Sequence, residues 1–199
     1  MARTDRPTSL PLTGDADADR LLADDPLALL IGMVLDQQIP LERAFRAPMD
    51  LRDRLGGRLE AADIAARPPD ELAAAFSAAP ALHRYPSSMA GRVQQVCQVL
   101  VDRYGGDAAA LWEGAADGGD LLARVAALPG FGDQKARIFV ALLGKRLGVR
   151  PPGWEEASAP FGSPGTYHSV ADVDSPEALA RVREHKAALK AAAKAGGRG

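Results

Sequence analysis

The chain has 199 residues, 47% of them hydrophobic, which is enough to bury a core in one compact domain or two small lobes. Its formal net charge of -2 argues against a protein that holds nucleic acid by overall charge alone. The single cysteine, Cys97, excludes an internal disulfide, and His83, His168 and His185 are too widely spaced to form a ligand motif. We therefore expect no structural metal and no iron-sulfur cluster.

No run is long and apolar enough to cross a membrane, and residues 1–14 lack the apolar core of a signal peptide. A cytoplasmic protein is expected. Aromatic residues make up only 5% of the chain, and its periodic segments are rich in alanine, without a series of alternating β-branched runs. These patterns predict an all-α fold.

The first helix is predicted to begin at Asp25 and Pro26, as a capping aspartate followed by a proline, and to be buried almost all round. It runs into the polar stretch Asp36-Gln37-Gln38-Ile39-Pro40, and Pro40 forces a new helix to begin. These polar side chains need partners, which are either the local backbone or a ligand.

Residues 80–86 form an irregular corner that displays His83, Arg84 and Tyr85 between two prolines. An imidazole, a guanidinium and a phenol ring together suit stacking on nucleic acid bases, and equally suit an ordinary packed corner. A helix over 89–104 follows.

The stretch from Leu128 to Asp133 reads as a hairpin between two helices, the first over 121–127 and the second beginning at a capping Asp133. Gly130 and Gly132 can both take positive φ and expose the main chain at the start of the second helix. Unpaired N–H groups and the positive end of a helix dipole make this geometry suitable for a phosphate.

Positive charge concentrates in two segments, over 133–150 and from Arg181 onward, which are either ordinary helix surfaces or a nucleic-acid contact. The segment 160–174 is rich in Gly, Ser and Pro and reads as an irregular connection. A last helix is expected from Ser175 to about Ala195.

These residues resemble the helix-hairpin-helix DNA glycosylases of base-excision repair. Leu128-Pro129-Gly130-Phe131-Gly132 matches the family's hairpin, and Ala136 lies where its second helix usually has alanine. The resemblance covers about 24–154. More narrowly, 35–40 and 83–86 look like stretches of small actinobacterial base-excision repair proteins without an iron-sulfur cluster.

The resemblance implies a two-lobed all-α fold in which 1–199 form a single unit. Residues 24–154 would form the helical barrel, with the hairpin over 121–147, and 155–199 would complete the second lobe. The implied partner is double-stranded DNA containing a damaged base, bound by a monomer associated with the nucleoid.

In this family the hairpin backbone holds a DNA phosphate, which assigns that role to Gly130, Phe131 and Gly132, with Lys135 as a further phosphate contact. The family often uses a monovalent cation here, expected at the Gly130 and Gly132 backbone. A damaged nucleotide is flipped into the cleft between the lobes.

By position, Gln38 matches the family's inserted glutamine, and the loop of His83, Arg84 and Tyr85 lies where the opposing wedge is found. Gln134 and Trp154 are then expected to line the base pocket.

The family's catalytic aspartate would fall near 152–154, where this chain has none. Such a carboxylate stabilises positive charge on the sugar. Glu155, Asp36 and Glu42 are the candidates. A solvated surface is the competing interpretation for Glu155, and a structural cap for Asp36.

Members that also cut the DNA backbone carry a lysine two residues after the second hairpin glycine, where this chain has Gln134. Lys135 is one residue further, rotated by about 100°, so we expect it to point away from the cleft. This favours a monofunctional glycosylase. The alternatives are a non-catalytic DNA-binding protein and a helical interaction protein that never meets DNA.

Overall fold

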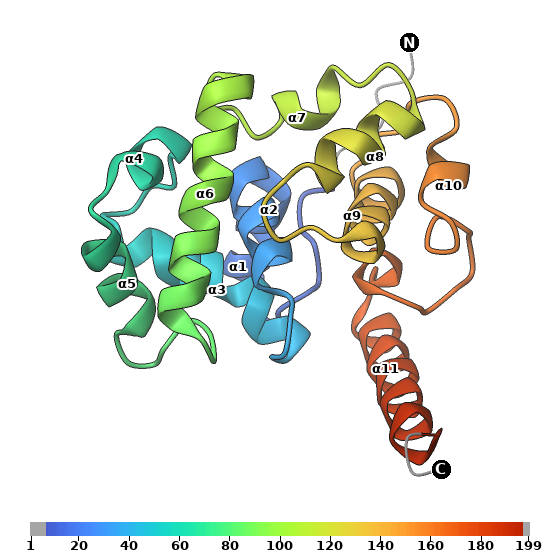
Figure 1. Cartoon of the computed structure of the whole chain (residues 1–199). Coiled ribbons are helices and arrows are strands. Elements are labelled where there is room, and N and C mark those ends of the chain that lie inside the picture. The colour runs from blue at the N-terminus through green and yellow to red at the C-terminus, as the bar shows by residue number, and fades with distance from the viewer. Residues whose placement is uncertain (1–6, 197–199) are drawn as a thin grey trace.

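The computed structural model describes residues 7–196, and the regular elements in this range are helices, which confirms the predicted all-α fold (Figure 1). In chain order they are α1 (Ala16–Asp24), α2 (Pro26–Leu35), α3 (Leu41–Arg54), α4 (Ala61–Ala66), α5 (Pro69–Ser77), α6 (Pro86–Tyr104), α7 (Ala110–Glu113), α8 (Gly118–Ala126), α9 (Asp133–Arg146), α10 (Trp154–Ala157), the 3-10 helix η1 (Val170–Asp172) and α11 (Pro176–Gly196). Within this range, no helix combines the length and the apolar character needed to cross a membrane.

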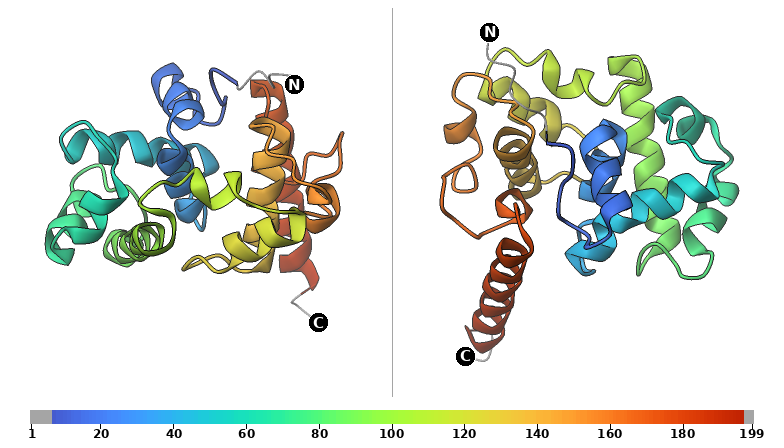
Figure 2. Two further views of the ribbon diagram at one scale, coloured as in Figure 1. Left: turned by 90° about the horizontal axis from the view of Figure 1, so that it is seen from above. Right: turned by 180° about the vertical axis from the view of Figure 1, so that it is seen from behind.

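The helices form two groups, which the views in Figures 1 and 2 show side by side. Helices α1 to α6 form the first lobe, α7 leads across, and α8 to α11 form the second lobe. One cluster of buried apolar side chains runs through both lobes and includes Leu30 of α2 and Phe139 of α9. The lobes therefore share a core.

Helix α2 is the buried centre of the first lobe. Asp25 caps it by accepting hydrogen bonds from the N–H groups of Leu27 and Ala28, as predicted, and every residue after Pro26 is buried. The helix ends at Leu35, three residues before the Gln38 that the family resemblance indicates. Asp36 leaves the helix with φ -71° and ψ 71°, and Gln38 adopts φ +57°, so the chain turns before it reaches Ile39, the residue that Pro40 restricts.

The long connection between α9 and α11 is attached to α9 by a buried ion pair. Lys145 Nζ lies 2.6 Å from Asp172 Oδ1 and also donates to the Ser163 carbonyl at 2.6 Å. Asp172 Oδ2 accepts from the His168 N–H at 2.8 Å, so one carboxylate orders the connection on both sides. The side chains of Lys145 and Asp172 are only 9% and 3% exposed.

Lys145→Met should lower the free energy of unfolding by about 3–5 kcal/mol, because it leaves Asp172 as a buried charge without its partner. The measurement is urea unfolding followed by circular dichroism. The matched control is Arg20→Met, which breaks the exposed pair between Arg20 and Asp17 and should leave the stability nearly unchanged. Equal effects of the two substitutions would contradict this role for Lys145.

Candidate functional site

The predicted hairpin between α8 and α9 is present, with a different start to the second helix. Gly130 takes φ +85°, as expected, but Gly132 has φ -79° and ψ 172°, an extended conformation open to any residue. Gly132 itself occupies the capping position. Asp133 is the first helical residue, and its carboxylate accepts from Arg137 Nε at 2.9 Å instead of capping. The first N–H groups of α9 therefore have no side-chain cap.

Phe131 anchors the hairpin to the core. Its ring is buried and packs against Phe139 with the centroids 6.0 Å apart. Its N–H donates to the Leu128 carbonyl at 3.1 Å, so the main chain of Phe131 does not offer the phosphate-binding donor expected of it. The Gly132 carbonyl accepts the N–H of Ala136 at 2.9 Å as the first bond of α9. A cation at that carbonyl stays a prediction.

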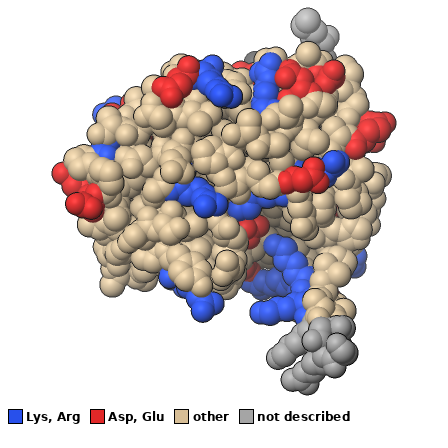
Figure 3. All heavy atoms as spheres, viewed as in Figure 1, with Lys and Arg blue, Asp and Glu red and all other residues tan. Residues whose placement is uncertain are grey.

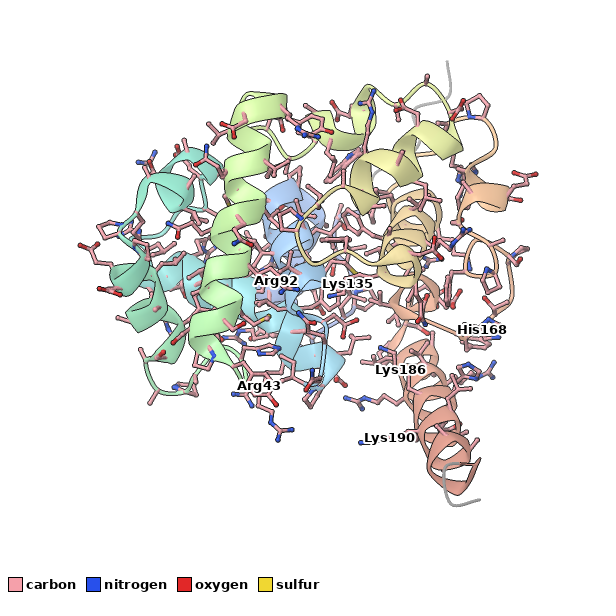
Figure 4. The ribbon with its side chains drawn as sticks, viewed as in Figure 1. Arg43, Arg92, Lys135, His168, Lys186 and Lys190 are labelled. Carbon is pink, nitrogen blue, oxygen red and sulfur yellow. The ribbon has the colours of Figure 1, made fainter. Side chains whose placement is uncertain are left out.

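Arg92 of α6 lies against the hairpin from the other lobe. The Arg92 side chain (labelled in Figure 4) occupies the space that a Cβ at Gly130 would take, and the positive φ of Gly130 itself favours glycine. The sequence gives no signal for this contact, because Arg92 and Gly130 are far apart in the chain. The result is a guanidinium beside the exposed backbone of the hairpin.

Lys135 points into the space between the lobes, so the expectation that it points away is wrong. Its Nζ donates to the Val34 carbonyl at the end of α2, at 3.1 Å, and lies 5.8 Å from the centre of the Phe131 ring. The rotation argument placed Gln134 toward the cleft, but α9 is turned so that Gln134 is exposed at the rim and Lys135 faces α2.

Burial lowers the pKa of Lys135 from 10.5 to about 8. The negative charge of Asp36 opposes this change, while the positive charges of Arg92 and Lys186 add to it. Lys135 is therefore partly neutral near pH 8. A neutral amine is a nucleophile and a base, which a surface lysine at the same pH is not.

A cavity of about 520 Å³ opens between the hairpin and the end of α2, and we call it the interlobe cleft. Its lining residues are Met33, Asp36, Gly130, Gly132, Asp133, Gln134, Lys135, Ile138 and Lys186. The Asp36 side chain is 12% exposed, and its Oδ2 lies 3.8 Å from Lys186 Nζ. Of the candidate carboxylates, Asp36 is the one that lines this cleft.

The other two carboxylates lie elsewhere. Glu155 lies in α10 and lines a separate cavity of about 290 Å³ beside the connection that follows it. Trp154 lines the same cavity, packs against Gly144, and has the Arg150 guanidinium 5.8 Å from its ring centre. Glu42 forms an ion pair with Arg183. The structure thus does not bring Glu155 and Trp154 together with the hairpin, because α10 packs on the outer side of α8 and α9.

The loop after α2 and the loop before α6 lie next to each other. Gln38 and Arg84 line one cavity of about 540 Å³, together with Ile39, Pro40 and Lys190. Tyr85 is 44% exposed, and the Arg84 guanidinium lies 5.5 Å from the centre of its ring. Three of the side chains expected to contact bases are therefore accessible at this edge.

His83 is the exception, since it is buried and not displayed for stacking. Its Nδ1 accepts from the Tyr85 N–H at 3.0 Å, which leaves Nε2 as the donor to the Gln37 carbonyl at 2.9 Å. Burial lowers the pKa of the ring and so favours its neutral form, and the Gln37 carbonyl opposes this shift. Of the two interpretations given for this corner, the packed one applies to His83. Its hydrogen bond to the Gln37 carbonyl joins the loop before α6 to the loop after α2.

Comparison with known proteins adds little to this geometry. No family model and no curated protein matches the chain. Among solved structures it is similar to an endonuclease III trapped as a covalent intermediate with DNA in an estranged-adenine complex, with 22% identity and a TM-score of 0.42. The match covers 66% of this chain and 65% of that one. A likeness of this strength does not argue for an activity, which must come from the residues of this chain.

Proposed function

We propose that this protein is a DNA glycosylase of base-excision repair, which binds duplex DNA at the hairpin and breaks the N-glycosidic bond of a damaged base in the interlobe cleft. One observation carries the proposal: the Asp36 carboxylate and the Lys135 amine line the same cavity beside an uncapped helix start. An acid and an amine with a lowered pKa in one cleft are typical of an active site.

Binding begins with the DNA backbone. The uncapped N–H groups at the start of α9 and the Arg92 guanidinium face the same hairpin, which together suit one phosphate. Such contacts set the position of the duplex without reading its sequence. We propose the hairpin for this role, with Arg92 taking the place that the sequence assigned to Lys135.

Flipping a nucleotide leaves a gap in the base stack, and a protein side chain must fill it. Gln38 is exposed on a turn with positive φ, and Arg84 and Tyr85 stand on the adjacent loop. The hydrogen bonds of His83 hold the two loops in a fixed relation. We assign the filling role to Gln38, Arg84 and Tyr85.

Breaking the bond builds positive charge on the sugar, which the Asp36 carboxylate stabilises. Two versions differ in the nucleophile. The monofunctional version uses water, and it rested on Gln134 in place of the family's lysine and on Lys135 pointing away from the cleft. Because Lys135 points inward and burial lowers its pKa to about 8, which favours the neutral amine, we propose Lys135 as the nucleophile instead.

In this version the Lys135 lone pair forms a bond to C1′ of the sugar. The C1′–N bond to the base breaks, and the base leaves with its electron pair and takes up a proton. The nitrogen on C1′ then loses a proton, its lone pair breaks the C1′–O4′ bond, and O4′ takes up a proton, which gives an iminium between Lys135 and C1′. Water resolves this intermediate.

The test is base release from duplexes that each carry one lesion, with alkylated purines, deaminated bases and oxidised bases in the panel. We expect abasic sites from at least one class under single-turnover conditions. Duplex binding with no release from any class would favour the non-catalytic DNA-binding protein. Absence of duplex binding would contradict both the glycosylase and the non-catalytic DNA-binding protein.

Gly132→Ser should weaken duplex binding at least tenfold and leave the fold intact. A serine at the capping position bonds the first N–H groups of α9 with its own hydroxyl, so the phosphate loses its donors. A Cβ at this position meets open space. Fluorescence anisotropy with a labelled duplex measures the affinity, and thermal unfolding checks the fold.

The matched control is Glu60→Ser, which adds the same hydroxyl at the start of α4, outside the interlobe cleft. Its affinity for DNA should equal that of the unmodified protein. If Gly132→Ser also binds like the unmodified protein, the start of α9 does not hold a phosphate.

A further inference from the structure

Helix α11 is packed near its start and largely exposed from there to Ala193. Near its start, Ala178, Leu179 and Val182 are buried, and α11 contacts η1. From Arg183 to Ala193 the side chains are exposed or half-buried, and Leu189 is 57% exposed. Figures 1 and 2 show this part extending from the body of the second lobe. Burial against the core therefore explains only the first turns of α11, and not the exposed part that follows.

One face of the extended part carries cations directed at the first lobe. Arg183, Lys186 and Lys190 follow each other at intervals of three and four residues, which places them on one side of a helix. Arg183 pairs with Glu42 of α3, Lys186 approaches Asp36, and Lys190 lines the cavity that holds Gln38. Figure 4 shows the Lys186 and Lys190 side chains on this face.

Two of these cations, Lys186 and Lys190, line successive cavities that start at the hairpin. Lys186 lines the interlobe cleft with Gly130 and Gly132, and Lys190 lines the next cavity along α11. Figure 3 shows Lys and Arg side chains gathered around the hollow between α11 and the first lobe. In the interlobe cleft Asp36 and Asp133 accompany the two lysines of that cleft, whereas the charged residues that line the next cavity, Arg84 and Lys190, are both cations.

The cavity at Lys190 lacks an acidic partner among its lining residues. Two of the five, Arg84 and Lys190, are cations, and the others are Gln38, Ile39 and Pro40. Two like charges facing one cavity repel each other, and an anion between them removes that cost. The geometry therefore fits a ligand that presents negative charges in a row.

We propose that α11 is a second phosphate-binding wall, on which Lys186 and Lys190 bind the backbone of the duplex held at the hairpin. The proposal rests on the DNA-binding part of the proposed function and not on its chemistry. The hairpin and α11 would then hold phosphates on both sides of the nucleotide that enters the cleft. Two phosphate-binding sites that lie apart from each other also favour a bent duplex.

The test is the salt dependence of duplex binding by the double variant Lys186→Ala/Lys190→Ala, measured by anisotropy with an undamaged duplex. Each lost phosphate contact lowers the slope of log K against log salt by about 0.9, so the pair should lower it by about 2. Affinity at 0.1 M salt should fall at least tenfold. Alanine favours helix at both exposed positions, so the fold is kept.

The control is Arg58→Ala/Arg103→Ala, which removes the same charge from exposed positions that line neither cavity. Its slope should match that of the unmodified protein. Because Lys186 also neighbours Asp36, the single reversal Lys190→Glu is a second variant, and it should weaken binding more than Lys190→Ala.

An unchanged salt slope in both Lys186→Ala/Lys190→Ala and Lys190→Glu would overturn the proposal. An equal decrease of the slope in the control Arg58→Ala/Arg103→Ala would overturn it too, because it would indicate that only net charge matters. A reduced slope together with no base release from any lesion would support the α11 wall while removing the glycosylase. Failure of the unmodified protein to bind duplex would overturn both.

Discussion

Asp36→Asn should lower the rate of base release about 100- to 1,000-fold, because the amide no longer stabilises the positive charge that develops on the sugar. The side chain keeps its shape, and binding to undamaged duplex should stay within a few-fold or tighten, since a negative charge leaves a cleft that holds Lys135 and Lys186. Single-turnover kinetics on the best lesion and anisotropy measure the two quantities.

Glu155→Gln is the matched control, since it makes the same chemical change in the separate cavity beside α10. Its rate should equal that of the unmodified protein. A slow Glu155→Gln with a normal Asp36→Asn would reverse the assignment and make Glu155 the catalytic carboxylate.

Lys135→Met should raise the free energy of unfolding at pH 7 by about 1–3 kcal/mol and abolish covalent trapping. Burial lowers the pKa of this lysine from 10.5 to about 8, so the folded protein bears a cost for keeping the side chain charged. The difference between these values corresponds to about 3 kcal/mol, and the hydrogen bond lost at Val34 reduces the net gain.

The pH dependence of this gain has a definite sign. Below pH 8 both the folded and the unfolded chain are protonated at Lys135, and the full cost is present. Between pH 8 and 10.5 the unfolded chain binds more protons, so the stability contributed by Lys135 rises with pH. The advantage of Lys135→Met should therefore shrink over this range and be gone above it, as urea unfolding at several pH values would measure.

Borohydride reduction tests the chemical role of Lys135. The unmodified protein with a lesion duplex should give a covalent complex with DNA, and Lys135→Met should give none. The control is Lys145→Arg, which keeps a cation at a position outside the cleft. Base release by Lys135→Met at the normal rate, without trapping in either protein, would restore the monofunctional version.

Local signals in the sequence predicted the presence of the hairpin and the positions of several helices, α2 and α6 among them. Asp25 before Pro26 sets the start of α2, and Gly105, with φ +61°, ends α6. Such signals act over a few residues through hydrogen bonds and allowed φ values, so they can be read without the fold. The positive φ of Gly130 belongs to the same group.

The side chains that fill the cleft depend on how helices pack, which no local signal contains. The direction of Lys135 follows from the rotation of α9 against α2, and an error of one residue turns a side chain through about 100°. The choice among three carboxylates required the position of α10. Arg92 was missed because its contact with Gly130 joins two lobes.

The hydrogen bond from Lys135 to Val34 links the motion of the two lobes to proton uptake. Any opening that separates α9 from α2 returns the ammonium to water, and its pKa then rises from about 8 toward 10.5. Near pH 9 the open form therefore takes up a proton and the closed form releases it. Closure around a ligand at this pH becomes easier as the pH rises, and the heat of binding there should vary with the ionisation enthalpy of the buffer.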